Sequence, residues 1–276
     1  MPLRVAQLSD IHCGSPRHDA RLLAQAVDQI LAMEPDLVVV AGDLTQEGYA
    51  EEFQAARDAL RPLQESLTTV IVPGNHDAKN VGHLHFEDHF GKGEDGRADT
   101  TLRLRRENEP SSVCVVAVDS SKPDLADGEV GKFRYGWIRQ QFAEPADLRM
   151  FVLHHHLVSV PGTGRERNIV WDAGDVLAVL EECRVDVVLC GHKHVPHVWL
   201  LGKMLLVSSG TVSSYRTRGY ARPSFNVVEI DSDRIRVTLV HPGSDERVVA
   251  DFDRAGRRLV RNPQFSEMFS KEGWEW

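Results

Sequence analysis

The chain has 276 residues, of which 42% are hydrophobic and 26% are charged, a balance typical of one large globular domain with a sizeable core. The formal net charge is -9 and the acidic residues are scattered, so long nucleic acid is not an expected partner. No apolar run approaches the roughly 20 residues of a membrane-spanning helix, and the first residues lack the features of a secretory signal. We therefore expect a cytoplasmic protein with no membrane partner.

Short β-branched runs alternate with segments of helical periodicity through the first two thirds of the chain, which is the pattern of parallel strands joined by crossover helices. The expected strands of this part are Val5–Leu8, Leu37–Ala41, Thr69–Val72, Val113–Val118, Met150–Leu153 and Val185–Leu189. The expected helices are Arg17–Met33, Tyr49–Leu63, Phe133–Phe142 and Asp172–Cys183. A polar stretch that contains Gly91, Gly93 and Gly96 is expected to form a loop or lid.

The pattern changes after Gly191, where strands follow one another with few helical signals between them. These strands are His197–Leu201, Lys203–Val207, Phe225–Ile230 and Arg234–Val240, and they indicate a second sheet of meandering strands. No repeat or linker divides the chain, so we expect one domain over residues 1–261. The tail over residues 262–276 carries four aromatic residues, which favours docking on the domain or a homodimer contact.

Polar residues follow five of the expected strands at the point where each strand ends. In chain order they are Asp10 and His12; Gly42 and Asp43; Gly74, Asn75, His76 and Asp77; His154, His155 and His156; and Gly191, His192, Lys193 and His194. Ligand sites of open α/β sheets lie beyond the carboxyl ends of the strands, so these clusters are expected to converge.

Convergent carboxylates, imidazoles and an amide are the ligands of a two-metal site. A bridging carboxylate holds two ions roughly 3.5–4 Å apart, and the pair activates a water for in-line attack on phosphorus. The absence of Cys ligands argues against a structural zinc site. Oxygen and imidazole ligands suit two divalent ions, or Fe(III) with a divalent ion, and Mn, Fe, Zn and Co all remain candidates.

The chain resembles the calcineurin-like metallophosphoesterases over roughly residues 5–230. The resemblance rests on five blocks that occur in the family's order: DxH, GD, GNHD, a histidine block and GHxH. The resemblance implies an α/β fold, a four-layer αββα sandwich of two mixed β-sheets flanked by helices. It also implies that a hydroxide is shared between the ions. The implied metal ligands are Asp10, His12 and His194 for the first ion, Asn75, His155 and His192 for the second, and Asp43 as the bridge.

The histidine ligand before Leu157 has three candidates, His154, His155 and His156. The family usually shows a His two residues before a Pro, and Leu157 stands where that Pro is expected, so we choose His155. The resemblance further implies that His76 is not a ligand but donates a proton to the leaving oxygen or stabilises phosphoryl charge. Asp77 is expected to orient His76.

Two further groups of residues have alternative interpretations. His83, His85 and His89 lack a carboxylate partner at metal-binding spacing, and we expect solvated or locally hydrogen-bonded side chains. Arg216 and Arg218 follow a Ser-Gly-Thr segment that resembles a loop of bacterial cyclic-nucleotide phosphodiesterases. They are either phosphate ligands or surface charges on a hairpin.

The residues after Asp43 distinguish among activities within the family. They do not form the Asp-Arg-Gly signature of protein phosphatases, and Gln46 stands where purple acid phosphatases carry a Tyr ligand. The segment resembles bacterial class III cyclic-nucleotide phosphodiesterases and glycerophosphodiesterases, which implies hydrolysis of a small phosphodiester such as 3',5'-cyclic AMP. The alternatives are a phosphomonoesterase, a nucleotide pyrophosphatase and a non-catalytic scaffold of the same fold.

Overall fold

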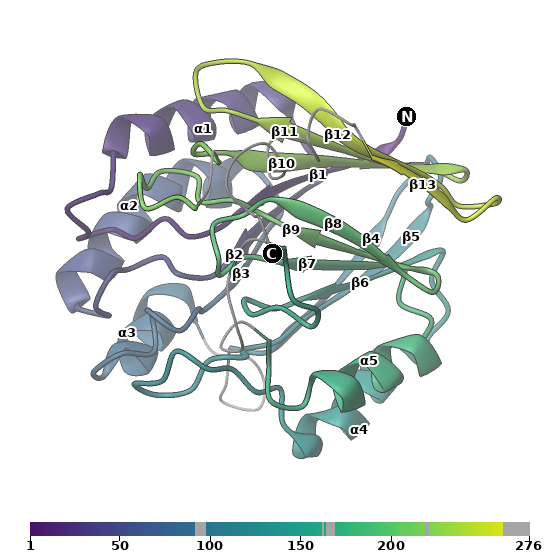
Figure 1. Cartoon of the computed structure of the whole chain (residues 1–276), viewed down its shortest axis with the longest axis horizontal. Coiled ribbons are helices and arrows are strands. Elements are labelled where there is room, and N and C mark those ends of the chain that lie inside the picture. Colours follow the sequence, from purple (N-terminus) through teal and green to yellow (C-terminus); the bar gives the residue numbers. More distant parts are fainter. Residues whose placement is uncertain (92–97, 162, 164–168, 219–220, 262–276) are drawn as a thin grey trace, which may run out of the picture.

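Two mixed β-sheets lie face to face in the computed structural model, and helices cover the outer face of each (Figure 1). The structure describes residues 1–91, 98–161, 163, 169–218 and 221–261. The expectation that the tail docks or forms a dimer contact lies outside these residues, as do Gly93 and Gly96 of the expected loop. The expected αββα sandwich is confirmed.

The first sheet contains seven strands in the order β13-β12-β11-β10-β1-β2-β3. Their bounds are β1 Leu3–Leu8, β2 Leu37–Ala41, β3 Thr69–Val72, β10 Phe225–Ile230, β11 Arg234–Val240, β12 Glu246–Asp253 and β13 Arg258–Arg261. The strands β1, β2 and β3 are parallel, and β10 pairs antiparallel with β1. The helices on this side are α1 Ala20–Met33, α2 Ala50–Ser66 and α3 Gly82–Phe90.

The second sheet contains six strands in the order β4-β5-β6-β7-β9-β8. Their bounds are β4 Thr100–Arg105, β5 Ser112–Ala117, β6 Leu148–Val152, β7 Val187–Cys190, β8 His197–Leu201 and β9 Met204–Ser208. The strands β5, β6, β7 and β9 are parallel. Helices α4 (Lys132–Gln141) and α5 (Ala173–Glu182) cover its outer face.

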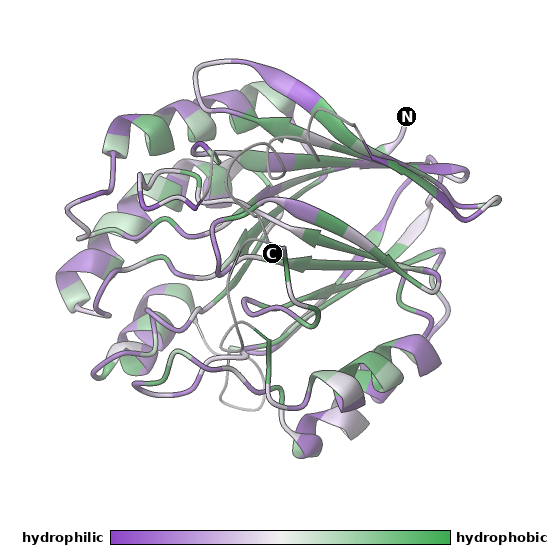
Figure 2. Cartoon of the chain, viewed as in Figure 1, coloured by the Kyte–Doolittle hydropathy of each residue, from purple (hydrophilic) through white to green (hydrophobic). Residues whose placement is uncertain are grey.

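The β2 strand illustrates why the central strands are hydrophobic along their whole length. Leu37 and Val39 belong to the core between the sheets, whereas Val38 and Val40 belong to the core beneath α1 and α2. Because both faces of such a strand are buried, the usual alternation of apolar and polar residues is lost. Figure 2 shows these hydrophobic strands in the middle of the molecule, with more hydrophilic residues on the outer helices.

The expectation of a separate second sheet after Gly191 was wrong. The hairpin β8–β9 extends the second sheet through a parallel pairing of β9 with β7. The hairpin β10–β11 instead extends the first sheet through β1. Strong hydrophobic runs identify such strands, but their partners depend on contacts between distant parts of the chain.

Several element boundaries also differ from the prediction. Helix α2 continues through Pro62 to Ser66, and α3 occupies the segment before Gly91. The half-exposed strand β4 and the edge strands β12 and β13 were not predicted. Among the described residues, no helix has the length and apolar character needed to cross a membrane.

Candidate metal centre

The parallel strands of both sheets end at one edge of the sandwich, and the loops that follow them interlock there. The Asp10 amide donates to the Gly42 carbonyl over 2.9 Å, and the Gly191 amide donates to the His154 carbonyl over 2.9 Å. Gly42 adopts a φ of 84°, and a Cβ there would lie 2.5 Å from His154 Nδ1. Glycine is therefore required at Gly42 both by its backbone conformation and by the close approach of the second sheet.

Five residues at this edge have left-handed backbone conformations, which side chains other than glycine rarely adopt. They are Asp10 (φ 55°), His12 (φ 56°), Asp43 (φ 54°), His192 (φ 82°) and His194 (φ 60°). Such conformations cost free energy and concentrate at functional sites. The fold thus holds these side chains in a strained but defined arrangement.

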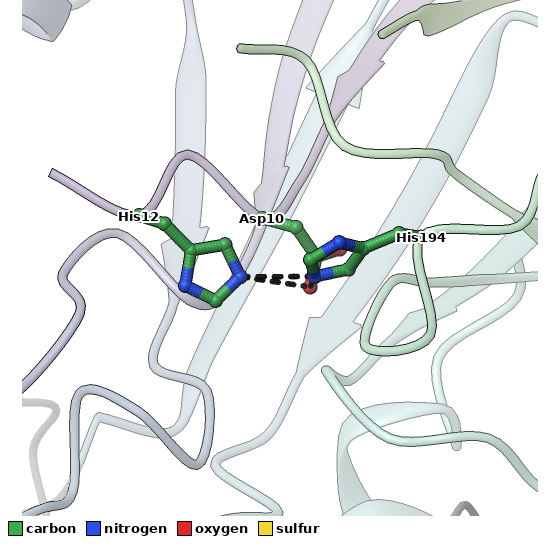
Figure 3. A group of neighbouring side chains, drawn as sticks. All are labelled: Asp10, His12 and His194. Carbon is green, nitrogen blue, oxygen red and sulfur yellow. Dashed lines mark hydrogen bonds and ion pairs between the residues drawn. The ribbon is translucent and has the colours of Figure 1, made fainter. Parts of the chain in front are cut away.

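The first cluster consists of Asp10, His12 and His194, and all three side chains are buried. The Nε2 atoms of His12 and His194 lie 2.9 Å apart, and His194 Nε2 lies 3.3 Å from Asp10 Oδ1. Figure 3 shows the two imidazoles and the carboxylate of this cluster directed toward one point.

The second cluster consists of Asp43, His154 and His192, again buried, with Asn75 beside them. His154 Nε2 lies 3.4 Å from Asp43 Oδ2 and 3.3 Å from Asn75 Oδ1. His192 Nδ1 lies 2.9 Å from the same Asn75 oxygen and 3.3 Å from His154 Nε2.

Asp43 connects the two clusters. Its Oδ1 accepts a 2.8 Å hydrogen bond from the His76 amide, which leaves Oδ2 directed into the site. Oδ2 lies 3.8 Å from His12 Nε2 and 3.4 Å from His154 Nε2. One carboxylate therefore faces an imidazole of each cluster.

The three consecutive histidines have different surroundings. His154 faces Asp43, whereas His155 Nδ1 lies 2.9 Å from Ser120 Oγ and His156 Nδ1 lies 3.3 Å from Cys190 Sγ. The prediction chose His155, but the structure brings His154 to the acidic cluster. Strand β6 ends at Val152, and the Leu153 amide donates to the Leu189 carbonyl over 3.2 Å, so His154 is the second residue beyond the strand.

Backbone carbonyls fix the orientation of two imidazoles. His154 Nδ1 donates to the Ala41 carbonyl over 2.7 Å, and His194 Nδ1 donates to the Arg216 carbonyl. A carbonyl only accepts hydrogen bonds, so the proton of each neutral ring resides on Nδ1 and the lone pair of Nε2 points into the site. Histidines that bind metals are commonly oriented in this way.

The charges of the site also fit bound cations. Burial lowers the pKa of His12 to about 3 and that of His192 well below its usual range, so both are neutral potential ligands. Burial opposes protonation of His154, but the charge of Asp43 raises its pKa to about 9. A metal cation would replace that balancing proton. Asp10 Oδ1 is buried and accepts no hydrogen bond from the described residues.

His76 and Asp77 occupy neighbouring positions but have different partners. The His76 ring lies edge-on to His12, with centroids 4.7 Å apart, and its Nδ1 donates to the Gln46 carbonyl over 2.6 Å. The Asp77 carboxylate instead accepts from the backbone amides of Leu44, Thr45 and Gly74. Gln46, rather than the predicted Asp77, therefore contacts the His76 imidazole, and Asp77 joins the two loops.

A cavity of about 290 Å³ opens over the two clusters. It is lined by Asp43, Asn75, His76, Ala126, His192, Lys193, His194, Arg216, Thr217 and Arg218. Both predicted arginines thus lie at the site. Lys193 was not singled out from the sequence, although its position between His192 and His194 was a usable signal. Burial, and then the charge of Arg218, lowers the pKa of Lys193.

The three histidines after Val81 lie outside both metal clusters, on helix α3. His85 and His89 pack against Phe53 with ring centroids 6.3 Å and 6.0 Å away. His89 Nδ1 donates to the His85 carbonyl over 2.8 Å, and His83 is exposed. They have the solvated or local interactions expected from the sequence.

Comparisons with known proteins agree with this geometry. A glycerophosphodiester phosphodiesterase of Enterobacter lignolyticus is 28% identical over 69% of this chain and 70% of its own length. A 3',5'-cyclic-nucleotide phosphodiesterase of Nostoc sp. is 23% identical over 70% of this chain and 72% of its own length. The solved structure of a dimetal phosphatase from Danio rerio has the same fold, with a TM-score of 0.66 at 14% identity over 90% of this chain and 99% of that chain.

The family model described as calcineurin-like phosphoesterase matches residues 3–196, a range that contains both clusters and the five strand-end motifs. The chain therefore belongs to the calcineurin-like phosphoesterase family and is a metal-dependent phosphoester hydrolase.

Proposed function

We propose that the chain is a di-metal phosphodiesterase that hydrolyses a small phosphodiester such as 3',5'-cyclic AMP. The observation that carries this proposal is the position of Asp43 Oδ2, which lies 3.8 Å from His12 Nε2 and 3.4 Å from His154 Nε2. A carboxylate shared in this way is suited to bridge two cations.

The proposed ligand set follows the two clusters. Asp10, His12 and His194 hold one ion, Asn75, His154 and His192 hold the other, and Asp43 bridges them. His154 replaces His155 in the set expected from the sequence, because its Nε2 lies 3.4 Å from Asp43 Oδ2, where one cation can contact both atoms. When bound, the ion pair supplies a polarised water and positive charge for the phosphoryl oxygens.

His76 handles the proton of the leaving group in this proposal. Its Nδ1 is engaged by the Gln46 carbonyl, so Nε2 is the nitrogen available to the substrate in the cavity that His76 lines. A protonated imidazole gives the Nε2 proton to the departing oxygen, a role in which a positioned His contributes about 10²–10⁴-fold. Arg216 and Arg218 line the same cavity and bind anionic groups of the substrate there.

Two observations favour a small diester. The cavity of about 290 Å³ is just below the roughly 300–1,000 Å³ of small-molecule sites, which suits a small ligand. The bacterial relatives bear the names of glycerophosphodiester and cyclic-nucleotide phosphodiesterases, and the proposal transfers that substrate class to this chain.

The test uses purified protein reconstituted with Mn and two chromogenic substrates, the diester bis(p-nitrophenyl) phosphate and the monoester p-nitrophenyl phosphate. We expect the diester to be hydrolysed faster, and 3',5'-cyclic AMP to be converted to AMP. Hydrolysis confined to the monoester would instead indicate a phosphomonoesterase. Metal binding without any hydrolysis would indicate a scaffold.

A further inference from the structure

Three cationic side chains line the cavity above the metal centre, although the chain as a whole has a net charge of -9. Lys193 comes from the loop after β7, and Arg216 and Arg218 come from the loop after β9. Two separate segments therefore bring positive charge to the same cavity.

None of these three side chains donates a hydrogen bond to, or forms an ion pair with, any residue in the described part of the chain. Two other lysines of the described residues are paired: Lys79 Nζ contacts Gln46 and Glu47, and Lys122 contacts Glu129. Asp43 lines the same cavity, but in the proposed function its carboxylate is a metal ligand, which leaves the three cations available to a bound anion. Such an arrangement is adapted to bind an anionic ligand.

The number of positive charges in the cavity indicates how much negative charge the substrate carries. A simple phosphodiester has one negative charge, and the proposed metal pair already neutralises it. Three further cations exceed what that charge requires. A phosphate monoester carries about -1.5 to -2 charge near neutral pH and has three acceptor oxygens, which suit guanidinium and ammonium donors.

We propose that Lys193, Arg216 and Arg218 form a subsite for a second phosphate group of the substrate, next to the phosphodiester that is cleaved. The inference rests on the proposed function, and it adds a preference, among small phosphodiesters, for those that carry another phosphate. Lys193 determines specificity in this account, because it lies between two residues of the metal centre and is the most enclosed of the three cations.

The experiment compares two substrates that differ only in the second phosphate, thymidine 5'-(p-nitrophenyl phosphate) with and without a 3'-phosphate. We expect the wild-type protein to have at least about tenfold higher kcat/KM for the 3'-phosphorylated compound. Lys193→Met should reduce that preference by at least about fivefold, as expected when one charge-assisted contact is lost, and Lys193→Arg should restore most of it.

Two further variants separate binding of the second phosphate by Lys193 from a general effect of charge and from a loss of metal. Lys203→Met removes the same charge in the exposed turn between β8 and β9 and should leave both rates unchanged. Arg218 lies outside the loop that carries His192 and His194, and Arg218→Met should also reduce the preference for the 3'-phosphorylated substrate. If Lys193→Met lowers metal content, measured by elemental analysis, the result with Arg218→Met decides.

Two outcomes overturn the inference. One is a wild-type protein without preference for the second phosphate. The other is an equal loss on both substrates in Lys193→Met and Arg218→Met, which would indicate only general attraction of anions.

Calorimetry with nucleotides that lack a diester bond separates failure of the inference from failure of the proposed function. Thymidine 3',5'-bisphosphate should bind at least about tenfold more tightly than thymidine 5'-phosphate, and Lys193→Met should reduce that difference even in a protein without diesterase activity. Equal affinity of the two nucleotides for the wild-type protein contradicts the subsite whether or not hydrolysis is observed.

Discussion

Replacing His154 and His155 one at a time tests which of them holds the second metal ion. His154 Nε2 lies within 3.4 Å of an Asp43 oxygen and within 3.3 Å of the Asn75 and His192 side-chain atoms. We expect His154→Ala to bind one ion per chain where the wild-type protein binds two.

The expected loss of metal affinity in His154→Ala follows from the position of the His154 ring. Loss of an outer-sphere partner of a metal ligand typically costs about 10–100-fold in metal affinity, so loss of the ligand itself should cost at least about 100-fold. His155→Ala removes a side chain that contacts Ser120 Oγ at 2.9 Å. The buried hydroxyl then loses a partner, which costs about 1–3 kcal/mol of folding stability, while both ions should remain bound.

The assay is elemental analysis of each variant after dialysis against Mn, combined with thermal unfolding. His154→Ala should lose metal, and His155→Ala should lose thermal stability with full metal content. The reverse pattern, in which His155→Ala loses an ion and His154→Ala keeps both, would refute the assignment and restore the prediction from the sequence.

Three other substitutions test separate parts of the site. His76→Ala should lower kcat on the diester by about 10²–10⁴-fold at unchanged metal content. The control His83→Ala, on the exposed side of α3, should leave kcat unchanged. Retained turnover in His76→Ala would remove His76 from the mechanism. Asp43→Ala should reduce binding of both ions, and full occupancy in a metal titration would exclude a bridging role. Asp77→Ala should reduce the free energy of unfolding by about 3 kcal/mol or more, because a buried carboxylate that accepts several hydrogen bonds is lost. Asp88→Ala, an exposed control, should change the denaturation midpoint little, and a similarly small effect of Asp77→Ala would contradict the loop-joining role.

The sequence predicted the central strands and the clustering of the motifs because both depend on short-range patterns. A run such as Leu37–Ala41 is hydrophobic on both faces and has few other interpretations. The strand β4 escaped prediction since its residues are only half buried. The pairing of β10 with β1 could not be predicted because their contacts are more than 200 residues apart in the chain.

The choice between His154 and His155 shows a similar limit at the site. Family spacing favoured His155, but the Ala41 carbonyl, 113 residues away in sequence, accepts the His154 Nδ1 proton. The role of Asp77 likewise depends on amides that belong to another loop. Residue types predicted the phosphoesterase family, whereas contacts between the two sheets determine which side chain lies at each position of the site.

The number of metal ions that diester hydrolysis requires tests most directly the central claim that the site holds two ions. Metal-free protein is titrated with Mn while hydrolysis of bis(p-nitrophenyl) phosphate is measured. The two-cluster site joined by Asp43 predicts that activity rises until two ions are bound per chain. Full activity at one ion per chain, or diester hydrolysis in metal-free protein, would contradict it.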